Sequence, residues 1–345
     1  MRRAAPLGIA ALAISLTGCQ AGYYAQLVRG QYQLLMRREP IEEVIASPQT
    51  DATLRARLGR ALDARRFATQ VLALPDNGSY TDYADLGRPY ALWNVFATPE
   101  LSMASRQWCY PLAGCMAYRG YYDLDDARAE SARLAAAGFD VHIGGVPAYS
   151  TLGWFDDPVL NTIVASDDQV TGTIFHELAH QRRYIKGDTA FNESFATFVE
   201  QEGLRQYLGG APGRIASALQ RRERDREFIG LMLDARERLA QLYASALTEA
   251  EKRQRKAAEF ERLRERYAAA RAGWGGDAAY DGWLAGPLNN ARLLPFGLYH
   301  QWVPAFNALY AQVGSDWTAF HAKIDELAET EPEVRQRQLE ALTPP

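Results

Sequence analysis

Cysteine, histidine and an excess of positive charge are the scarce features of this sequence. Its 345 residues contain three cysteines and five histidines, so a zinc site built from two pairs of cysteines is excluded. Acidic residues outnumber basic ones, 42 to 38, and this balance excludes a nucleic-acid-binding protein by bulk charge. The chain also lacks internal repeats and low-complexity linkers, while its hydrophobic content of 48% is ordinary. We therefore expect a globular protein with one large domain.

The N-terminus lacks an apolar run long enough to span a membrane, but it has the parts of an export signal. Two basic residues, Arg2 and Arg3, precede a short apolar run over residues 4–16. This arrangement predicts a secretory signal peptide over residues 1–18. The letters LTGC that end at Cys19 match a bacterial lipobox.

The lipobox predicts that Cys19 is lipidated and becomes the first residue of the mature chain. A plain signal peptide with a coincidental cysteine is the alternative. Gln20 follows where inner-membrane lipoproteins typically carry aspartate. We expect the membrane to be a partner through the N-terminal lipid, in the cell envelope facing the periplasm, with the outer membrane favoured over the inner.

Two cysteines remain in the mature chain once Cys19 is lipidated. Loss of Arg2 and Arg3 leaves 36 basic against 42 acidic residues, a formal charge of −6. Cys109 and Cys115 lie in an oxidising compartment, and a disulfide that closes this small loop is plausible. Two free buried thiols are the alternative, and neither cysteine has nearby histidines with which to bind zinc.

The letters HELAH over residues 176–180 carry most of the chemistry in this chain. On a helix, His176 and His180 project from one face and can hold one metal ion, while Glu177 lies at its open position. Catalytic zinc takes three protein ligands and a water, and Glu177 is placed to accept a proton from that water. The pattern predicts one Zn²⁺ per chain, on a helix from about Val170 to Lys186.

The third metal ligand should be a carboxylate on the next helix, which Asp188 or Thr189 can cap. At 1.5 Å per residue, Glu193 returns to roughly 4 Å from the level of His180, and Glu200 falls near the level of His176. We favour Glu193 as the ligand. Glu200 shares its face and is either a residue that orients a ligand or an alternative ligand. In the opposing interpretation both glutamates face solvent.

The strings HELAHQ and FNESFATFVEQEG resemble the gluzincin clan of metallopeptidases. The stretch from Tyr149 to Gly203 is similar to a family of bacterial lipoproteins described as zinc aminopeptidases. This resemblance implies a zincin-like metallopeptidase domain over residues 19–345. It also implies His176 and His180 as zinc ligands, with Glu193 as the third, and Glu177 as the catalytic base.

The pattern of the mature chain predicts an α+β fold that is predominantly helical. Residues 22–74 have helical spacings, broken by Pro40 and Pro48. Aromatic and β-branched residues then mark short strands around residues 92–96, 117–122 and 141–146, beside one helix over residues 124–137. Residues 274–345 are expected to form a further compact helical part.

Residues 212–272 predict a helical hairpin that projects from the catalytic domain as an insertion. Charges of both signs alternate along it, and Thr248 with Glu251 forms a capping box where the second helix should begin. Phe260, Leu263 and Tyr267 give that helix a narrow apolar stripe. The hairpin is either a solvated structural arm or an arm that serves as a lid or docks an envelope protein partner.

Several residues outside the metal motif are candidates for contact with substrate. Tyr299 and His300 are candidate donors to the oxyanion of the reaction, and Asn289 and Asn290 are candidate hydrogen-bonding partners of substrate. The segment over residues 141–150 is either an edge strand that pairs with an extended substrate or a turn between core strands. Acidic candidates to bind a free α-amine are Glu200, Glu202, Asp156 and Asp157.

Together these patterns predict a membrane-anchored zinc metallopeptidase that hydrolyses peptide bonds with a metal-activated water. The substrate is expected to be a short peptide cleaved as by an aminopeptidase, while an endopeptidase or a peptidase of cell-wall peptides remains open. The alternative is a noncatalytic zinc-containing envelope lipoprotein that acts as an interaction scaffold. Glu177 argues against the scaffold, because a scaffold has no chemical need for it.

Overall fold

The computed structural model describes residues 22–110, 114–164, 167–209 and 212–343. The predicted signal peptide and Cys19 lie outside these residues. A helix spans residues 22–35. The other helices are α2 (Ile41–Ala46), α3 (Ala52–Gln70), α4 (Leu124–Ala136), α5 (Asp167–Arg182), α6 (Thr189–Leu208), α7 (Pro212–Ala244), α8 (Glu249–Gly273), α9 (Asp281–Leu284), α10 (Asn290–Tyr299), α11 (Val303–Gln312), α12 (Trp317–Ala328) and α13 (Pro332–Leu342). None of the helices in these ranges is both long and apolar enough to cross a membrane.

The strands are short and form three small sheets. They are β1 (Arg38–Pro40), β2 (Asp82–Ala84), β3 (Leu92–Pro99), β4 (Trp108–Tyr110), β5 (Gly114–Met116), β6 (Arg119–Tyr121), β7 (Phe139–Val146) and β8 (Val159–Leu160). The sheet orders are β6-β3-β7, β1-β2-β8 and β4-β5. The prediction of an α+β fold that is mostly helical is confirmed.

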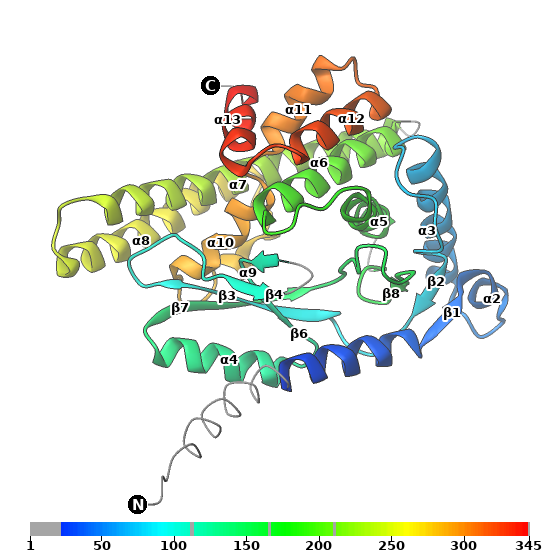
Figure 1. The fold of residues 1–345 in the computed structure, drawn as a ribbon, viewed down its shortest axis with the longest axis horizontal. Helices are drawn as coiled ribbons and strands as arrows, with labels where there is room; N and C mark the ends of the chain where they lie inside the picture. Colours follow the sequence, from blue (N-terminus) through cyan, green and yellow to red (C-terminus); the bar gives the residue numbers. More distant parts are fainter. Residues whose placement is uncertain (1–21, 111–113, 165–166, 210–211, 344–345) are drawn as a thin grey trace, which may run out of the picture.

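The antiparallel sheet β6-β3-β7 separates two helical layers (Figure 1). Side chains alternate across it because successive strand residues point to opposite faces. Val95 and Ala97 pack toward α4 and the helix over residues 22–35, whereas Phe96 packs toward α7, α8 and α10. The face that carries Phe96 is the one turned toward the functional site.

A second core surrounds α5, which is covered on several sides by helices (Figure 1). Helix α5 packs between α3 and α6, and α11 and α12 cover the outer side of α6. Phenylalanines dominate the contact, with Phe175 on α5 and Phe195 and Phe198 on α6 all at most 1% exposed. Such close packing fixes the rotation of α5 relative to α6.

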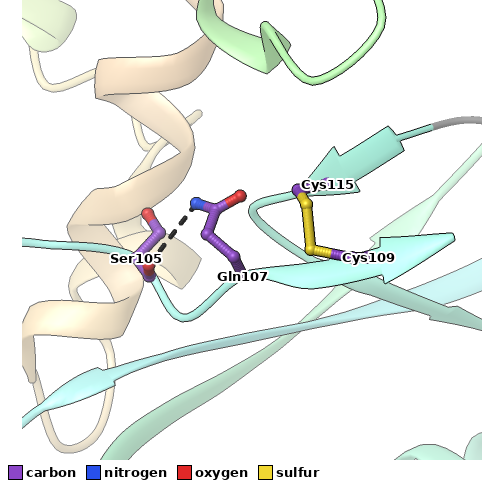
Figure 2. Close-up of a disulfide and its surroundings, with 4 residues drawn as sticks. All are labelled: Ser105, Gln107, Cys109 and Cys115. Atoms are coloured by element: carbon purple, nitrogen blue, oxygen red, sulfur yellow. Dashed lines mark hydrogen bonds between the residues drawn. A yellow bond between two sulfur atoms is a disulfide. The ribbon is translucent and has the colours of Figure 1, made fainter.

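A disulfide joins β4 and β5, the two strands of a small ribbon. Figure 2 shows Cys109 and Cys115 bonded across the ribbon, with the Gln107 amide donating a hydrogen bond to the Ser105 carbonyl just before β4. The cysteines are direct partners in the strand register. The structure therefore contains the disulfide and not the two free thiols of the alternative interpretation.

Helices α7 and α8 lie side by side and reach beyond the end of the sheet (Figure 1). The capping box of Thr248 and Glu251 is present at the start of α8. Part of the pair is attached to the rest of the domain. Its apolar stripe packs on α10 and Phe96, and Lys256 binds the Asp140 carboxylate at the start of β7, 2.6 Å away. The pair is a packed layer over the sheet.

Candidate metal centre

Helix α5 presents both motif histidines from a buried position. Asp167 and Asp168 open it, where acidic residues favour the positive end of the helix dipole. The helix ends at Arg182, four residues before the predicted end. There Arg182 forms two hydrogen bonds of 3.1 and 2.7 Å to the Asp325 carboxylate. An arginine at this helix end therefore ties α5 to α12.

The connection from α5 to α6 is closed by the side chain of Asn192. Its Oδ1 accepts from the Ile185 N–H and its Nδ2 donates to the Ile185 carbonyl, both at 2.8 Å. These bonds replace the helical bonds that Ile185 would make, which explains why α5 stops early. Gly187 has a φ of 83°, which suits glycine, and Asp188 caps α6 by accepting from the Phe191 N–H. Glu193 is thereby turned toward α5.

His176, His180 and Glu193 bring three metal-binding atoms together. Oε2 of Glu193 lies 3.5 Å from Nε2 of His176 and 3.6 Å from Nε2 of His180. All three donor atoms lie within 4.8 Å of one another. Ligands about 2.1 Å from a tetrahedral zinc lie roughly 3.4 Å apart. The two histidines and the carboxylate thus fit a zinc ion in both chemistry and spacing.

Further side chains orient these donors from behind. Oε2 of Glu200 lies 3.1 Å from Nδ1 of His176, so this carboxylate holds the ring with Nε2 turned inward. The hydroxyl of Tyr118 donates to Oε1 of Glu193 over 3.2 Å, which leaves Oε2 free for a metal. Nδ1 of His180 is buried and has no hydrogen-bond partner among the described residues.

The two central carboxylates differ in their affinity for protons. Burial raises the pKa of Glu177 to about 7, although the neighbouring His176 and His180 act in the opposite direction. Burial also works against ionised Glu193, but the two histidines outweigh it and lower the pKa of Glu193 to about 2. Glu193 is therefore suited to stay a carboxylate ligand, and Glu177 is suited to exchange a proton near neutral pH.

A cavity of about 250 Å³ opens over these residues. Glu177 and the three donor residues lie in its wall together with strand residues such as Asn94 and Val146. Six tyrosines also line it: Tyr23, Tyr110, Tyr118, Tyr149, Tyr184 and Tyr299. Phenol groups offer both hydrogen bonds and apolar ring surface, so the cavity can hold a ligand with an amide backbone and apolar side chains.

Of the two predicted oxyanion donors, Tyr299 reaches the cavity. Its ring stacks on that of His176, with centroids 6.3 Å apart and planes 26° apart. Burial, followed by the charges of Glu193 and Glu177, raises the pKa of Tyr299 well above its usual value, so the phenol keeps its proton to donate. His300 is absent from the cavity wall, and burial lowers its pKa to about 4.

The structure does not support substrate binding by Asn289 and Asn290, because both amides are used within the fold. Asn289 caps α10 and donates from Nδ2 to the Val141 carbonyl over 2.9 Å. Asn290 is 0% exposed and donates to the carbonyls of Glu100 and Ser102. Their polarity in the sequence reflects the attachment of α10 to the sheet.

Sequence reasoning missed several polar residues of the cavity wall, among them Tyr23, Asn94, Tyr118 and Tyr184. Tyr118 belongs to a stretch that was expected only to be a strand, and nothing near it in the sequence marks contact with Glu193. Tyr184 follows His180 by four residues, so the helical spacing of the motif offered a signal for this residue alone.

None of the four acidic candidates for binding a free α-amine lines the cavity. Glu200 contacts His176, and Glu202 pairs with Arg205. Asp157 is 4% exposed and accepts hydrogen bonds from Thr151 and Gln181. A free amine in this cavity would therefore meet tyrosine hydroxyls and the carboxylates of Glu177 and Glu193.

Comparison with known proteins adds one finding. A family model described as "Putative aminopeptidase" matches residues 22–339, which is nearly the whole described chain and includes every residue of the metal centre. No curated protein and no solved structure matches the chain.

Proposed function

The chain belongs to the family described as "Putative aminopeptidase", and from this premise we propose that it is a zinc-dependent peptidase with a zincin-like catalytic domain. The observation that carries the proposal is the pairing of the metal donors His176, His180 and Glu193 with a buried Glu177 in one cavity. Glutamates that faced solvent on an exposed helix would not line one cavity together with two imidazole rings. We propose short peptides as substrates and release of the N-terminal residue as the reaction.

The residues of the cavity have different roles in the proposed hydrolysis. His176, His180 and Glu193 would hold the metal, and bound zinc supplies a Lewis acid that polarises a carbonyl and lowers the pKa of a water. Glu177 accepts the proton of the attacking water and passes it to the leaving amine, for which a pKa of about 7 is well suited.

Tyr299 is the proposed donor to the oxyanion. Its stacking on His176 places the phenol beside the metal donors, and the raised pKa of Tyr299 keeps its O–H available as a hydrogen-bond donor. The edge strand β7 is proposed to hold the substrate backbone in extended form. Val146 at the end of this strand lies in the wall of the metal cavity.

We also propose that the protein is a lipoprotein, attached through Cys19 to the periplasmic side of an envelope membrane. The lipobox at Cys19 supports this location. A noncatalytic scaffold is the second candidate. It has no observation in its favour at the metal centre, because the environment of Glu177 is one that tunes a proton-transfer group.

The direct test is Glu177→Gln, with peptide hydrolysis and zinc content measured on the same samples. Hydrolysis should fall by at least about a hundredfold, the usual scale for loss of a general base, while zinc stays near one per chain. Glu265→Gln makes the same chemical change at an exposed position of α8 and should leave both values as they are. Equal activity in Glu177→Gln and the parent protein would refute the mechanism.

A peptide library digested with and without a chelator tests the class of peptidase. Stepwise release of single N-terminal residues, abolished by the chelator, is the expected pattern. Internal cuts would show an endopeptidase, and cleavage that survives metal removal would refute a metallopeptidase.

A further inference from the structure

A second cavity of about 390 Å³ adjoins the metal cavity. The two share Asn94, Val146 and Tyr299 in their walls, so they border each other at this point. The second cavity extends from there along β7 on one side and along α10 on the other. A ligand that begins at the metal centre can therefore continue into it.

Strand β7 offers unpaired backbone groups to this second cavity. Among the described strands it pairs only with β3. The carbonyl of Val146 accepts from the β3 side, at Ala91, while the carbonyl of Val141 faces away and is taken by Asn289. Because backbone direction alternates along a strand, Ile143 and Gly145 turn their N–H and C=O groups to the free edge. Both residues line the second cavity.

Arg292 is the cationic group of this cavity, and its charge has no carboxylate partner among the described ion pairs. Its guanidinium is held by the carbonyls of Ala285 and Gly282, at 3.0 and 3.3 Å, and lies over the ring of Trp283. Two of the five guanidinium N–H groups are used in this way. The remaining donors are fixed in direction and suit a carboxylate.

Helix α10 sets the distance between Arg292 and the metal centre. Arg292 and Tyr299 are seven residues apart, so they lie on one face of the helix, separated by about 10 Å along its axis. Pro295, between them, also lines the cavity. An extended peptide advances about 3.3 Å per residue. The interval from the metal centre to the cation therefore matches about three peptide residues.

From these observations we infer that the second cavity is a subsite for the C-terminal end of a short peptide, whose α-carboxylate binds the Arg292 guanidinium. The inference rests on the proposed peptidase function and specifies its substrate class: peptides with about three residues beyond the cleaved bond. The free edge of β7 holds the backbone of these residues. Longer chains would have to pass the Arg292 and Trp283 end of the cavity.

Asn94 strengthens the placement of the backbone between the two cavities. It is 3% exposed, and its Oδ1 has no hydrogen-bond partner among the described residues. Its neighbours across the sheet are Gly120 and Gly144, so no side chain stands beside it on that face. The amide of Asn94 is therefore left to hydrogen-bond a peptide group that passes from one cavity to the other.

The first experiment needs no variant. Tetrapeptides of one sequence, with a free C-terminal acid or a C-terminal amide, are compared by kcat/KM. A charge-assisted hydrogen bond corresponds to roughly a 10- to 100-fold preference for the free acid. In Arg292→Gln this preference should vanish, and Arg292→Lys should restore part of it. Arg264→Gln removes a nearby charge outside the cavity and should retain the full preference.

Equal cleavage of acid and amide by the parent protein would overturn the subsite while leaving the peptidase function intact. An amidated peptide with an internal glutamate that regains the preference would reassign Arg292 to side-chain recognition and overturn the terminal assignment. If no peptide is cleaved, the proposed function fails. Calorimetric binding of the same acid and amide peptides to Glu177→Gln then still tests the subsite, and a tighter fit of the acid supports it.

The helix over residues 22–35 carries an independent feature on its outer side. Tyr24, Val28, Tyr32 and Met36 follow one another at intervals of four and are 40%, 71%, 61% and 67% exposed. This spacing aligns them on one face of the helix and the turn that ends it. The helix that carries this stripe packs tightly on the domain. On its inner side, Gly30 lies so close to the Tyr122 ring that a Cβ at this position would be 2.1 Å from the ring.

The charged side chains of this segment are all positive. No Asp or Glu occurs between Gly22 and Arg38, while Arg29 and Arg37 are exposed. An apolar, tyrosine-containing stripe beside arginines is the composition of a helix that lies on anionic lipid. Cys19, the predicted lipid attachment site, precedes Gly22 by three residues, at most about 10 Å of chain.

We propose that this face rests on the anionic lipid surface of the membrane that holds the anchor. The test uses the full lipidated protein in vesicles that contain phosphatidylglycerol, labelled with an environment-sensitive dye at Val28→Cys. Spin-labelled lipids should quench this label, but not the same dye at Glu340→Cys on exposed α13. Equal quenching at both positions, or self-quenching between Val28 labels that indicates a second copy on this face, would overturn the proposal.

Discussion

His176 is contacted by two glutamates on opposite sides of its ring. Glu193 faces Nε2 and Glu200 faces Nδ1, and both come from α6. Residues seven apart lie on one helix face, so the sequence could predict that the two carboxylates face α5 together. Which of them also reaches His180 depends on the tilt of α6 against α5. This tilt cannot be derived from the spacing of residues in the sequence.

This geometry predicts different zinc losses for the two glutamates. Glu193→Ala should abolish tight zinc binding because it removes one of three donors. Glu200→Ala should weaken binding about 10- to 100-fold, the scale for a group that orients a ligand. Competition with a fluorescent chelator measures both, with Glu202→Ala on the same helix as the control. Zinc loss in Glu200→Ala alone would contradict the assignment of Glu193.

At the scale of elements, the turn between α5 and α6 determines whether the metal donors meet. The sequence predicted both helices and the stop near Gly187, since glycine and capping residues are local signals. It did not predict that Asn192 would replace the last turn of α5 by binding Ile185. A side chain that substitutes for a backbone partner leaves no periodic pattern.

Asn192→Ala should therefore affect both stability and metal binding. The change leaves the Ile185 N–H without a partner, while the Ile185 C=O keeps the hydrogen bond from the Asp188 N–H, at a cost of about 1 to 3 kcal/mol in unfolding free energy. It also frees the start of α6, so zinc affinity should fall at least about tenfold. Urea denaturation of the metal-free protein and zinc competition measure the two effects. The matched control is Asn307→Ala, which changes an exposed asparagine of α11. If Asn192→Ala alters the unfolding free energy and the zinc affinity no more than this control does, the role of Asn192 is contradicted.

The strands show why part of the fold was beyond the sequence. The eight-residue strands β3 and β7 lie where aromatic and β-branched residues cluster, which is the local signal for a strand. The strands of the β1-β2-β8 sheet have only two or three residues each. They exist because Tyr83 of β2 pairs with Val159 of β8, far along the chain. Such pairing is a property of the assembled molecule and has no local pattern.

At the scale of the whole molecule, the buried side chain of His321 makes the stability of the folded protein depend on pH. It is 2% exposed, and its Nε2 donates to the Leu72 carbonyl over 2.9 Å. Burial lowers the pKa of His321 to about 4 and outweighs the hydrogen bond to the Leu72 carbonyl, which raises it; the opposing charges of Arg182 and Asp325 are smaller causes. Below about pH 6.5 His321 becomes protonated in the unfolded chain, whereas in the folded chain it stays neutral to a lower pH.

The unfolding free energy should consequently fall as the pH drops from 6.5 to 4, by up to about 3 kcal/mol at about 1.4 kcal/mol per pKa unit. His321→Gln keeps an N–H donor and removes the titration, so it should flatten this part of the pH profile. Urea denaturation at pH 4.5 and 7 measures it, with chelator present so that metal release does not contribute. The same loss between the two pH values in both proteins would contradict the prediction.

The metal motif is local, but the cavity above it is assembled from the whole chain. His176, Glu177 and His180 were predictable because one helix carries them at fixed spacing. Asn94 comes from β3, Tyr118 from the bend between β5 and β6, and Tyr299 from α10. Tyr299 was a candidate only because such sites require a distal donor. The remaining wall residues needed the three-dimensional structure, since no spacing connects them to the motif.

Tyr23 belongs both to the first described helix and to the wall of the metal cavity. Its ring stacks on Tyr110, and its hydroxyl accepts from the Tyr110 hydroxyl over 3.2 Å. The inner side of the first described helix is thus part of the wall of the metal cavity. Removal of the N-terminal residues through Tyr23 would therefore take a side chain out of this wall, so a shortened protein should begin no later than Gly22.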